Sequence, residues 1–241
     1  AGEGLRDRLT LLGPVSDRAF DSEGRRATEL ALPHLGRWAR WHLHERDTRQ
    51  CGEGGVTWAM AVVLANLVGP LPEYPRLRVL ELGAGTGLAS LVLAGRGHGV
   101  LASDGEACVV ENLEENVDGV RGIETARIRW EVEEDRDSAE ALGPFDLVMG
   151  ADLIEGPERC DLLQMVLRRL SRAERSEAVL VERNRLGHAS RCAKAMRSEG
   201  WHVDEMSNPT GDDGAIINGE ANPALLRDGS AFSVALRIRP R

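Results

Sequence analysis

Short apolar runs alternate with amphipathic stretches along most of this chain. The short runs have the length and apolar content of buried β-strands, whereas the longer stretches repeat their apolar positions with the period of a helix. Strands are predicted at residues 77–82, 98–104, 126–133, 145–152, 177–183, 201–206 and 231–239. Helices are predicted at residues 57–68, 86–96, 106–117, 157–170 and 188–200.

Alternating strands and helices with short connections predict an α/β fold built on a doubly wound, mostly parallel sheet of Rossmann-like type. The seven predicted strands would form one sheet, which binds ligands at the carboxyl ends of its strands. No helix separates the final two strands, so they are expected to form an antiparallel hairpin at the edge of the sheet. The connection between them, 207–229, is long and rich in Gly, Asp and Asn.

Residues 1–54 are predicted to form a mainly helical N-terminal extension, and residues 55–241 the sheet domain. Ser22 could cap a helix that runs to about Leu32, and a second helix is expected from Leu35 to Glu45. The glycine-rich stretch 51–55 would then be a loop that leads into the sheet domain.

Composition excludes several classes of protein. Apolar residues make up 42% of the chain and charged residues 29%, which argues against disorder, and no apolar run reaches the roughly 18–20 residues of a membrane span. The net charge is −9 with dispersed basic residues, so nucleic acid is not the expected partner. The absence of a signal-peptide pattern predicts a cytoplasmic protein, or an organellar one whose targeting peptide has been removed.

Cysteine and histidine spacing gives no sign of a metal site. Cys51, Cys108, Cys160 and Cys192 lie far apart and form no C-x-x-C pair, so reduced and partly buried thiols are expected rather than a disulfide framework. The pair His42 and His44 lies in a stretch predicted to be helical, where the two rings would diverge. No metal is therefore expected.

Three glycines directly follow the first predicted strand of the sheet and open a helix. They belong to the loop Glu81-Leu82-Gly83-Ala84-Gly85-Thr86-Gly87, in which glycine permits tight turns and the helix N-terminus presents free N–H groups. Asp104 ends the next strand, 21 residues after Gly83, which is the spacing of a ribose-binding carboxylate. This combination of strand, glycine loop, helix and acid predicts a nucleoside cofactor.

The loop chemistry favours S-adenosylmethionine over a dinucleotide. Its spacing is G-x-G-x-G rather than G-x-G-x-x-G, and the acid Glu81 would repel a pyrophosphate but attract a cationic amino-acid group. S-adenosylmethionine carries an ammonium and a sulfonium and no phosphate. An NAD-dependent reductase is also not indicated, because the sequence has no Tyr-x-x-x-Lys pair: its single tyrosine is Tyr74.

The stretch VLELGAGTGLASLVLA resembles the first motif of the seven-β-strand methyltransferases, and resembles most closely the protein-lysine methyltransferases called methyltransferase family 16. Further matches are TWAMAVVLA with the family's W-x-x-A helix, the second-strand acid, the tryptophan of IRW and the fourth-strand motif FDLVMGAD. The resemblance implies S-adenosylmethionine as cofactor, S-adenosylhomocysteine as product and a protein as substrate.

The resemblance also implies roles for particular residues. Glu81 would hold the methionyl end, Asp104 the ribose and Trp130 the adenine, while Asp152 and Glu155 would line the substrate entrance as the candidate catalytic residues. The full set implied to bind the cofactor is Trp58, Glu81, Gly83, Ala84, Gly85, Thr86, Gly87, Asp104, Gly105, Trp130 and Ala151.

One departure from the family pattern leaves alternatives open. The family commonly has D-x-x-Y after its fourth strand, whereas this chain has Asp152-Leu153-Ile154-Glu155. A glutamate could still attract a cationic lysine. It could instead accompany a histidine or small-amine substrate, or a scaffold subunit with little or no activity. RNA is the least expected acceptor for so acidic a chain.

Overall fold

A seven-stranded sheet forms the centre of the molecule. The computed structural model describes residues 19–31, 40–170, 176–183, 185–207 and 233–239. Within this part the sheet order is β5-β4-β3-β6-β7-β9-β8. Its strands are β3 (Arg78–Leu82), β4 (Gly99–Asp104), β5 (Ile123–Arg127), β6 (Leu147–Ala151), β7 (Glu177–Arg183), β8 (His202–Ser207) and β9 (Ser233–Arg239).

Strands β3 to β7 pair in parallel, and β9 runs antiparallel to both β7 and β8. The predicted doubly wound, mostly parallel sheet with an antiparallel last strand is therefore confirmed. The order of the strands reverses at β3. Strands β4 and β5 add to one side of β3, and strands β6 and β7 add to the other side. The carboxyl ends of β3, β4 and β6 meet at this switch point, where such sheets bind ligands.

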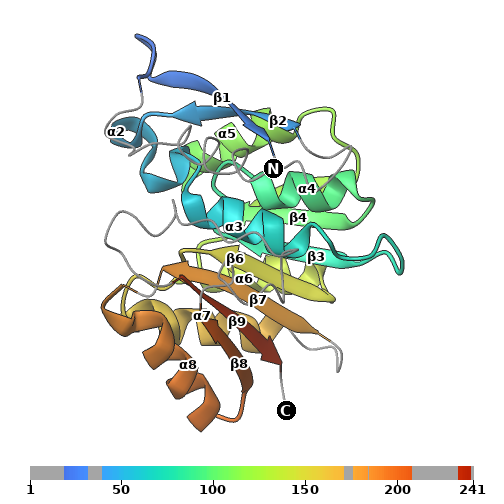
Figure 1. Cartoon of the computed structure of the whole chain (residues 1–241), viewed down its shortest axis with the longest axis vertical. Helices are drawn as coiled ribbons and strands as arrows, with labels where there is room; N and C mark the ends of the chain where they lie inside the picture. Colours follow the sequence, from blue (N-terminus) through green and yellow to red (C-terminus); the bar gives the residue numbers. More distant parts are fainter. Residues whose placement is uncertain (1–18, 32–39, 171–175, 184, 208–232, 240–241) are drawn as a thin grey trace, which may run out of the picture.

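Helices cover both faces of the sheet, and a layer of buried apolar side chains lies between each face and its helices. The first layer contains residues of α3, α4 and α5, and the second contains residues of α6, α7 and α8 (Figure 1). These helices are α3 (Ala59–Val68), α4 (Leu88–Gly95), α5 (Ala107–Val117), α6 (Glu133–Leu142), α7 (Pro157–Leu170) and α8 (His188–Ser198). Short helical segments are α2 (Thr48–Cys51), η3 (Glu53–Gly55) and η4 (Arg185–Gly187).

The predicted helices before residue 46 are wrong. Strand β1 (Arg25–Ala31) pairs antiparallel with β2 (Arg40–Arg46) in a separate two-stranded sheet, which lies beside α5 (Figure 1). Residues 1–18 and 32–39 of the predicted extension lie outside the described part of the chain, as does most of the connection 207–229. The extension as a domain of its own stays a prediction.

The alternating pattern of this hairpin is hard to see because polar residues occupy inward-facing positions. Thr28 and Glu45 are buried beside Leu30 and Leu43. The Thr28 hydroxyl donates to the Glu45 carboxylate at 3.0 Å, and the Thr57 amide donates to its other oxygen at 2.8 Å. These bonds satisfy polar groups that could not otherwise be buried.

The third predicted strand is displaced and one helix was missed. Strand β5 ends at Arg127, so that Trp130 lies in the loop after the strand and not within it. Helix α6 follows that loop, although no helix was predicted between residues 133 and 145. Ala139 is its one buried residue, and most of its ten residues are polar, so it offers few of the apolar positions from which a helix is predicted.

The expectation of reduced cysteines is also wrong. Cys51 is bonded to Cys108, and Cys160 to Cys192. The members of each pair are 57 and 32 residues apart in sequence, so their proximity arises from tertiary packing and left no mark in the cysteine spacing.

Within the described ranges, no helix is long and apolar enough to cross a membrane. No group of three or more potential ligand side chains is placed to hold a metal ion in that same part of the structure. His42 and His44 are both exposed on one face of β2, because that segment is a strand.

Candidate active site

A pocket of about 370 Å³ opens at the carboxyl ends of β3, β4 and β5. Gly83 of the glycine loop forms its floor, and its sides come from the turns after β4, β5 and β6. The lining residues are Gly83, Asp104, Gly105, Glu106, Arg127, Ile128, Arg129, Trp130, Glu131, Leu153, Glu155 and Arg159.

The glycine loop needs glycine at three positions. Gly83, Gly85 and Gly87 all have positive φ, which glycine adopts without the steric penalty of other residues. A Cβ on Gly83 would lie 2.6 Å from the Leu153 side chain, and one on Gly87 would lie 2.5 Å from that of Leu113. The loop can therefore follow this tight path only without side chains there.

Hydrogen bonds fix the two residues that lie between the glycines, Ala84 and Thr86. The Ala84 amide donates to the Ser103 carbonyl at 2.8 Å, and the hydroxyl oxygens of Thr86 and Thr57 lie 2.9 Å apart. Ala84 and Thr86 are buried and support the loop from behind. Neither lines the pocket, so their predicted contribution to cofactor binding would be through the backbone.

Asp104 ends β4 with its carboxylate at the pocket wall. One oxygen accepts the Gly85 amide and the other the Glu106 amide, each at 3.2 Å. Burial raises the pKa of Asp104 above its usual value, and the backbone bonds act in the opposite direction. The carboxylate is thus oriented by the glycine loop itself and can accept further hydrogen bonds from a ligand.

Trp130 forms a second wall of the pocket. Its ring is 8% exposed, and the Arg159 guanidinium lies 5.6 Å from the ring centre. Two other basic residues of the wall are also engaged, since Arg127 donates to the Gly105 carbonyl at 2.8 Å and Arg129 pairs with Asp135. Four acidic residues thus share the pocket wall with these three arginines, and only Arg129 is paired with a carboxylate; the acidic residues are Asp104, Glu106, Glu131 and Glu155.

Asp152 occupies an unusual backbone position after β6. Its φ is 55°, which is uncommon for a residue other than glycine and occurs preferentially at functional sites. Its carboxylate pairs with Arg183 at the end of β7, with Nη2 to Oδ2 at 2.6 Å. The Arg183 guanidinium also lies 5.3 Å from the ring centre of Trp58.

Trp58 connects this pair to the segment that precedes α3. Its indole N–H donates to the Glu53 carbonyl at 2.7 Å. The structure thus brings Trp58, Arg183 and Asp152 into one contact chain beside the pocket. Glu155 lines the pocket with an exposed side chain, and its place at a substrate entrance stays a prediction. Ala151 ends β6 just before Asp152.

Two buried carboxylates lie behind the visible lining of the pocket. Glu81 accepts the Ser90 hydroxyl beneath the glycine loop and does not line the pocket, so its role at the methionyl end stays a prediction. Glu182 accepts the amides of Leu153 and Ile154, both at 3.0 Å, and so holds the turn that carries Glu155. Burial raises the pKa of Glu81 to about 7 and that of Glu182 to about 8.

Sequence reasoning missed Glu182 and Arg183. Both follow the apolar run of the fifth predicted strand, at the edge of the sheet where ligands bind. A charged pair at the end of a buried strand could have marked them as candidates, although it gives no sign of their partners.

The raised pKa of Glu81 predicts that stability falls with rising pH. The folded protein keeps a proton on Glu81 that the unfolded chain has already released, so this contribution is complete below about pH 4.5 and is lost as the pH rises through about 7. Glu81→Gln stays neutral and should gain about 2–3 kcal/mol relative to wild type between pH 5 and pH 8. Denaturant unfolding at the two pH values measures this difference.

Glu124→Gln is the matched control because it removes an exposed glutamate from β5. It should keep the wild-type pH dependence. Glu182 titrates in the same direction, so a residual decline is expected in both variants. An unaltered pH dependence in Glu81→Gln would show that Glu81 is ionised in the folded protein.

A family model described as lysine methyltransferase matches residues 41–198, which is more than half of the chain. The chain belongs to the lysine methyltransferase family. The matched range begins in β2 and ends with α8, so it includes the glycine loop, Asp104, Asp152 and Glu182. It also includes the hairpin strand that had been expected to be helical.

Two relatives illustrate this family membership. The chain is 32% identical to the protein N-lysine methyltransferase METTL21A of Danio rerio over 133 residues, which cover 52% of this chain and 59% of that protein. It is 28% identical to a calmodulin-lysine N-methyltransferase of Arabidopsis thaliana over 155 residues, which cover 60% of this chain and 50% of that protein. The chain thus matches little more than half the length of these relatives.

Solved structures share the fold at low sequence identity. A TehB-like SAM-dependent methyltransferase from Corynebacterium glutamicum aligns with a TM-score of 0.52 and 17% identity, over 73% of this chain and 87% of that one. A ribosomal protein L11 methylase from Lactobacillus delbrueckii aligns with a TM-score of 0.51 and 18% identity, over 77% and 81%. The family's sheet is therefore that of the Rossmann-like methyltransferases.

Proposed function

We propose that this chain is an S-adenosylmethionine-dependent methyltransferase that methylates the side-chain amine of a lysine in a protein. The observation that carries the proposal is the pocket between the glycine loop, Asp104 and Trp130 in a chain of the lysine methyltransferase family. The named activities of the two relatives, both of which act on lysine, support the same substrate class.

The residues of the pocket fit the cofactor. The oxygens of the Asp104 carboxylate are oriented by two backbone amides, and each retains capacity to accept a hydroxyl of a ribose. Trp130 offers an aromatic wall for a purine, and Gly83, which lines the pocket without a side chain, permits a close approach of the methionyl part. No phosphate-binding group is required.

The acidic side of the pocket suits a cationic acceptor. Glu155 and Glu131 line it, and Glu155 is exposed at the turn after β6. A lysine ammonium would be attracted there by charge, while Arg183 is paired with Asp152 and lies against the Trp58 ring. The replacement of the family's tyrosine by Glu155 therefore preserves attraction for a cation.

When bound, the cofactor supplies a methyl group on a sulfonium, which is a good leaving group. The residues of this chain would act by alignment and by exclusion of water. Leu153 provides apolar surface that would lower the pKa of an entering amine by desolvation. Glu155, being exposed, gives the proton of that amine a path to solvent.

Methyl transfer from tritiated S-adenosylmethionine to protein tests this proposal. Purified chain is incubated with calmodulin and, separately, with a cell lysate, and the labelled residues are identified by mass spectrometry. Methyl-lysine that forms with wild type and not with Asp104→Asn is expected. Label on histidine alone would overturn the lysine assignment, and cofactor binding without any transfer would favour a scaffold role.

A further inference from the structure

The two disulfides have different surroundings. Cys51–Cys108 joins the end of α2 to the first turn of α5, and Cys108 is partly exposed whereas Cys51 is only 3% exposed. Cys160–Cys192 joins α7 to α8, and its cysteines are 5% and 3% exposed. Cys108 is therefore the one cysteine of the two bonds that is not buried, and a dissolved thiol should reach the first bond more readily than the second.

The Cys51–Cys108 bond borders the proposed cofactor pocket. Cys108 lies four residues after Asp104, and the segment that follows Cys51 covers the glycine loop. A Cβ on Gly85 would lie 3.2 Å from the Gly54 carbonyl oxygen, and a Cβ on Gly54 would lie 3.5 Å from an Asp104 oxygen. The bond thus fastens the covering segment to the helix that follows Asp104.

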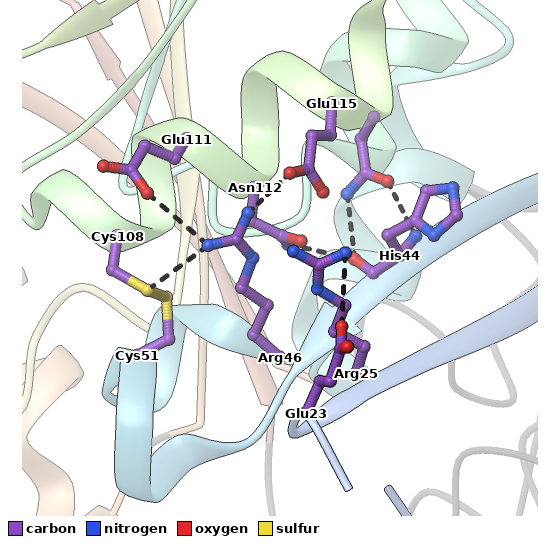
Figure 2. A network of polar contacts seen from close by, with 10 residues as sticks. Glu23, Arg25, His44, Arg46, Cys51, Cys108, Glu111, Asn112 and Glu115 are labelled. Carbon is purple, nitrogen blue, oxygen red and sulfur yellow. Dashed lines mark hydrogen bonds and ion pairs between the residues drawn. A yellow bond between two sulfur atoms is a disulfide. The ribbon is translucent and has the colours of Figure 1, made fainter. Parts of the chain in front are cut away.

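Arg46 lies directly beside this bond. Figure 2 shows its guanidinium between the Cys108 sulfur and the carboxylates of Glu111 and Glu115. Its Nη1 is 3.8 Å from Cys108 Sγ and 3.5 Å from Glu111, and its Nη2 is 2.6 Å from Glu115. A cation and the N-terminal end of an 11-residue helix both stabilise a thiolate at Cys108, and the two glutamates offset part of that effect.

We propose that Cys51 and Cys108 form a redox modification site, at which exchange with a dithiol reductant opens the bond and weakens binding of the cofactor. The inference rests on the proposed function of the neighbouring pocket. It concerns the segment from Cys51 to Gly55, whose position over the glycine loop depends on the bond.

The dithiol reductant supplies both the electrons and the protons for the exchange. A thiolate of the dithiol attacks the exposed Cys108 sulfur, the Cys51–Cys108 bond breaks, and Cys51 leaves as a thiolate that takes up a proton. The second thiol of the reductant then attacks the mixed disulfide and releases Cys108. The protein gains two electrons and two protons, and the reductant becomes a disulfide.

The direction of the effect follows from the pocket in the bonded form. With the bond in place the pocket of about 370 Å³ is open and Asp104 is oriented by Gly85. The oxidised protein is therefore already arranged for the cofactor, whereas the reduced protein must first order the covering segment. Preorganisation of this kind should make the affinity of the oxidised form about fivefold higher.

Graded reduction with dithiothreitol tests the site. Wild-type protein is equilibrated in buffers of increasing reducing strength, alkylated, and analysed by mass spectrometry for each cysteine pair. Calorimetric titration with S-adenosylhomocysteine is carried out on the same samples. Cys51 and Cys108 should become alkylated before Cys160 and Cys192, and the dissociation constant should rise about fivefold in step with them.

Two double variants provide the matched comparison. Cys51→Ser with Cys108→Ser should bind the cofactor as weakly as the reduced protein in every buffer, whereas Cys160→Ser with Cys192→Ser should keep the redox response. Equal affinity of oxidised and reduced wild type, or earlier reduction of Cys160–Cys192, overturns the inference and leaves the proposed function intact. Binding by neither form overturns the proposed cofactor site as well.

Discussion

Asp104→Asn is expected to lower the affinity for S-adenosylmethionine by about 100-fold, because an amide cannot replace this carboxylate. Both oxygens of Asp104 accept backbone N–H groups, one from Gly85 and one from Glu106. An asparagine would have to direct its own NH2 group at one of these donors. It would also lose the charge that strengthens a hydrogen bond from a ribose hydroxyl. Calorimetric titration measures the loss.

Asp118→Asn is the matched control for this prediction. Asp118 is exposed at the other end of α5. Its replacement by asparagine changes the net charge by the same amount as Asp104→Asn. Its dissociation constant should stay within twofold of wild type. A similarly small change in Asp104→Asn, in a variant whose thermal unfolding shows that it is folded, would mean that the ribose lies elsewhere.

Asp152→Gly should reduce the turnover number by roughly 100-fold, while the affinity for the cofactor should stay within about threefold of wild type. Glycine keeps the backbone conformation at φ 55°, whereas alanine would add strain and confuse the result. Without Asp152 the Arg183 guanidinium loses its partner. It can then turn from Trp58 toward the mouth of the pocket, where it would repel an entering lysine.

Methyl transfer to lysine and cofactor titration are the two readouts for this variant. Asp161→Asn is the control, since Asp161 is an exposed acid on the neighbouring helix α7. Turnover that is unaltered in Asp152→Gly would contradict the role assigned to the Asp152–Arg183 pair. An equal loss of cofactor affinity would instead place Asp152 among the cofactor ligands.

Local sequence signals were sufficient to predict the sheet and the pocket floor. The glycines of the loop, the strand before it and Asp104 all lie within 28 residues of each other, from Leu77 to Asp104. Their chemistry is also local, since Gly83 and Gly87 need positive φ and Asp104 simply ends its strand. Patterns of this kind depend little on the remainder of the fold.

Features that depend on tertiary contacts were missed. The hairpin β1–β2 buries Glu45, which is tolerated because Thr28 and Thr57 donate hydrogen bonds to its carboxylate. No local sequence pattern predicts those partners. The disulfides likewise depend on how α2 lies against α5 and α7 against α8. Glu182 could be recognised as a support for the turn at Leu153 only once β6 and β7 were seen side by side.

The place of β9 between β7 and β8 has a consequence for synthesis of the protein. Strand β8 pairs with β9 within the described sheet and with no other strand there, yet β9 begins at Ser233, well after β8 ends at Ser207. While the chain is still emerging from the ribosome, β7 has an open edge and β8 has no neighbour. Nascent chains should therefore depend on chaperones until residues 233–239 have left the exit tunnel, because open strand edges promote aggregation.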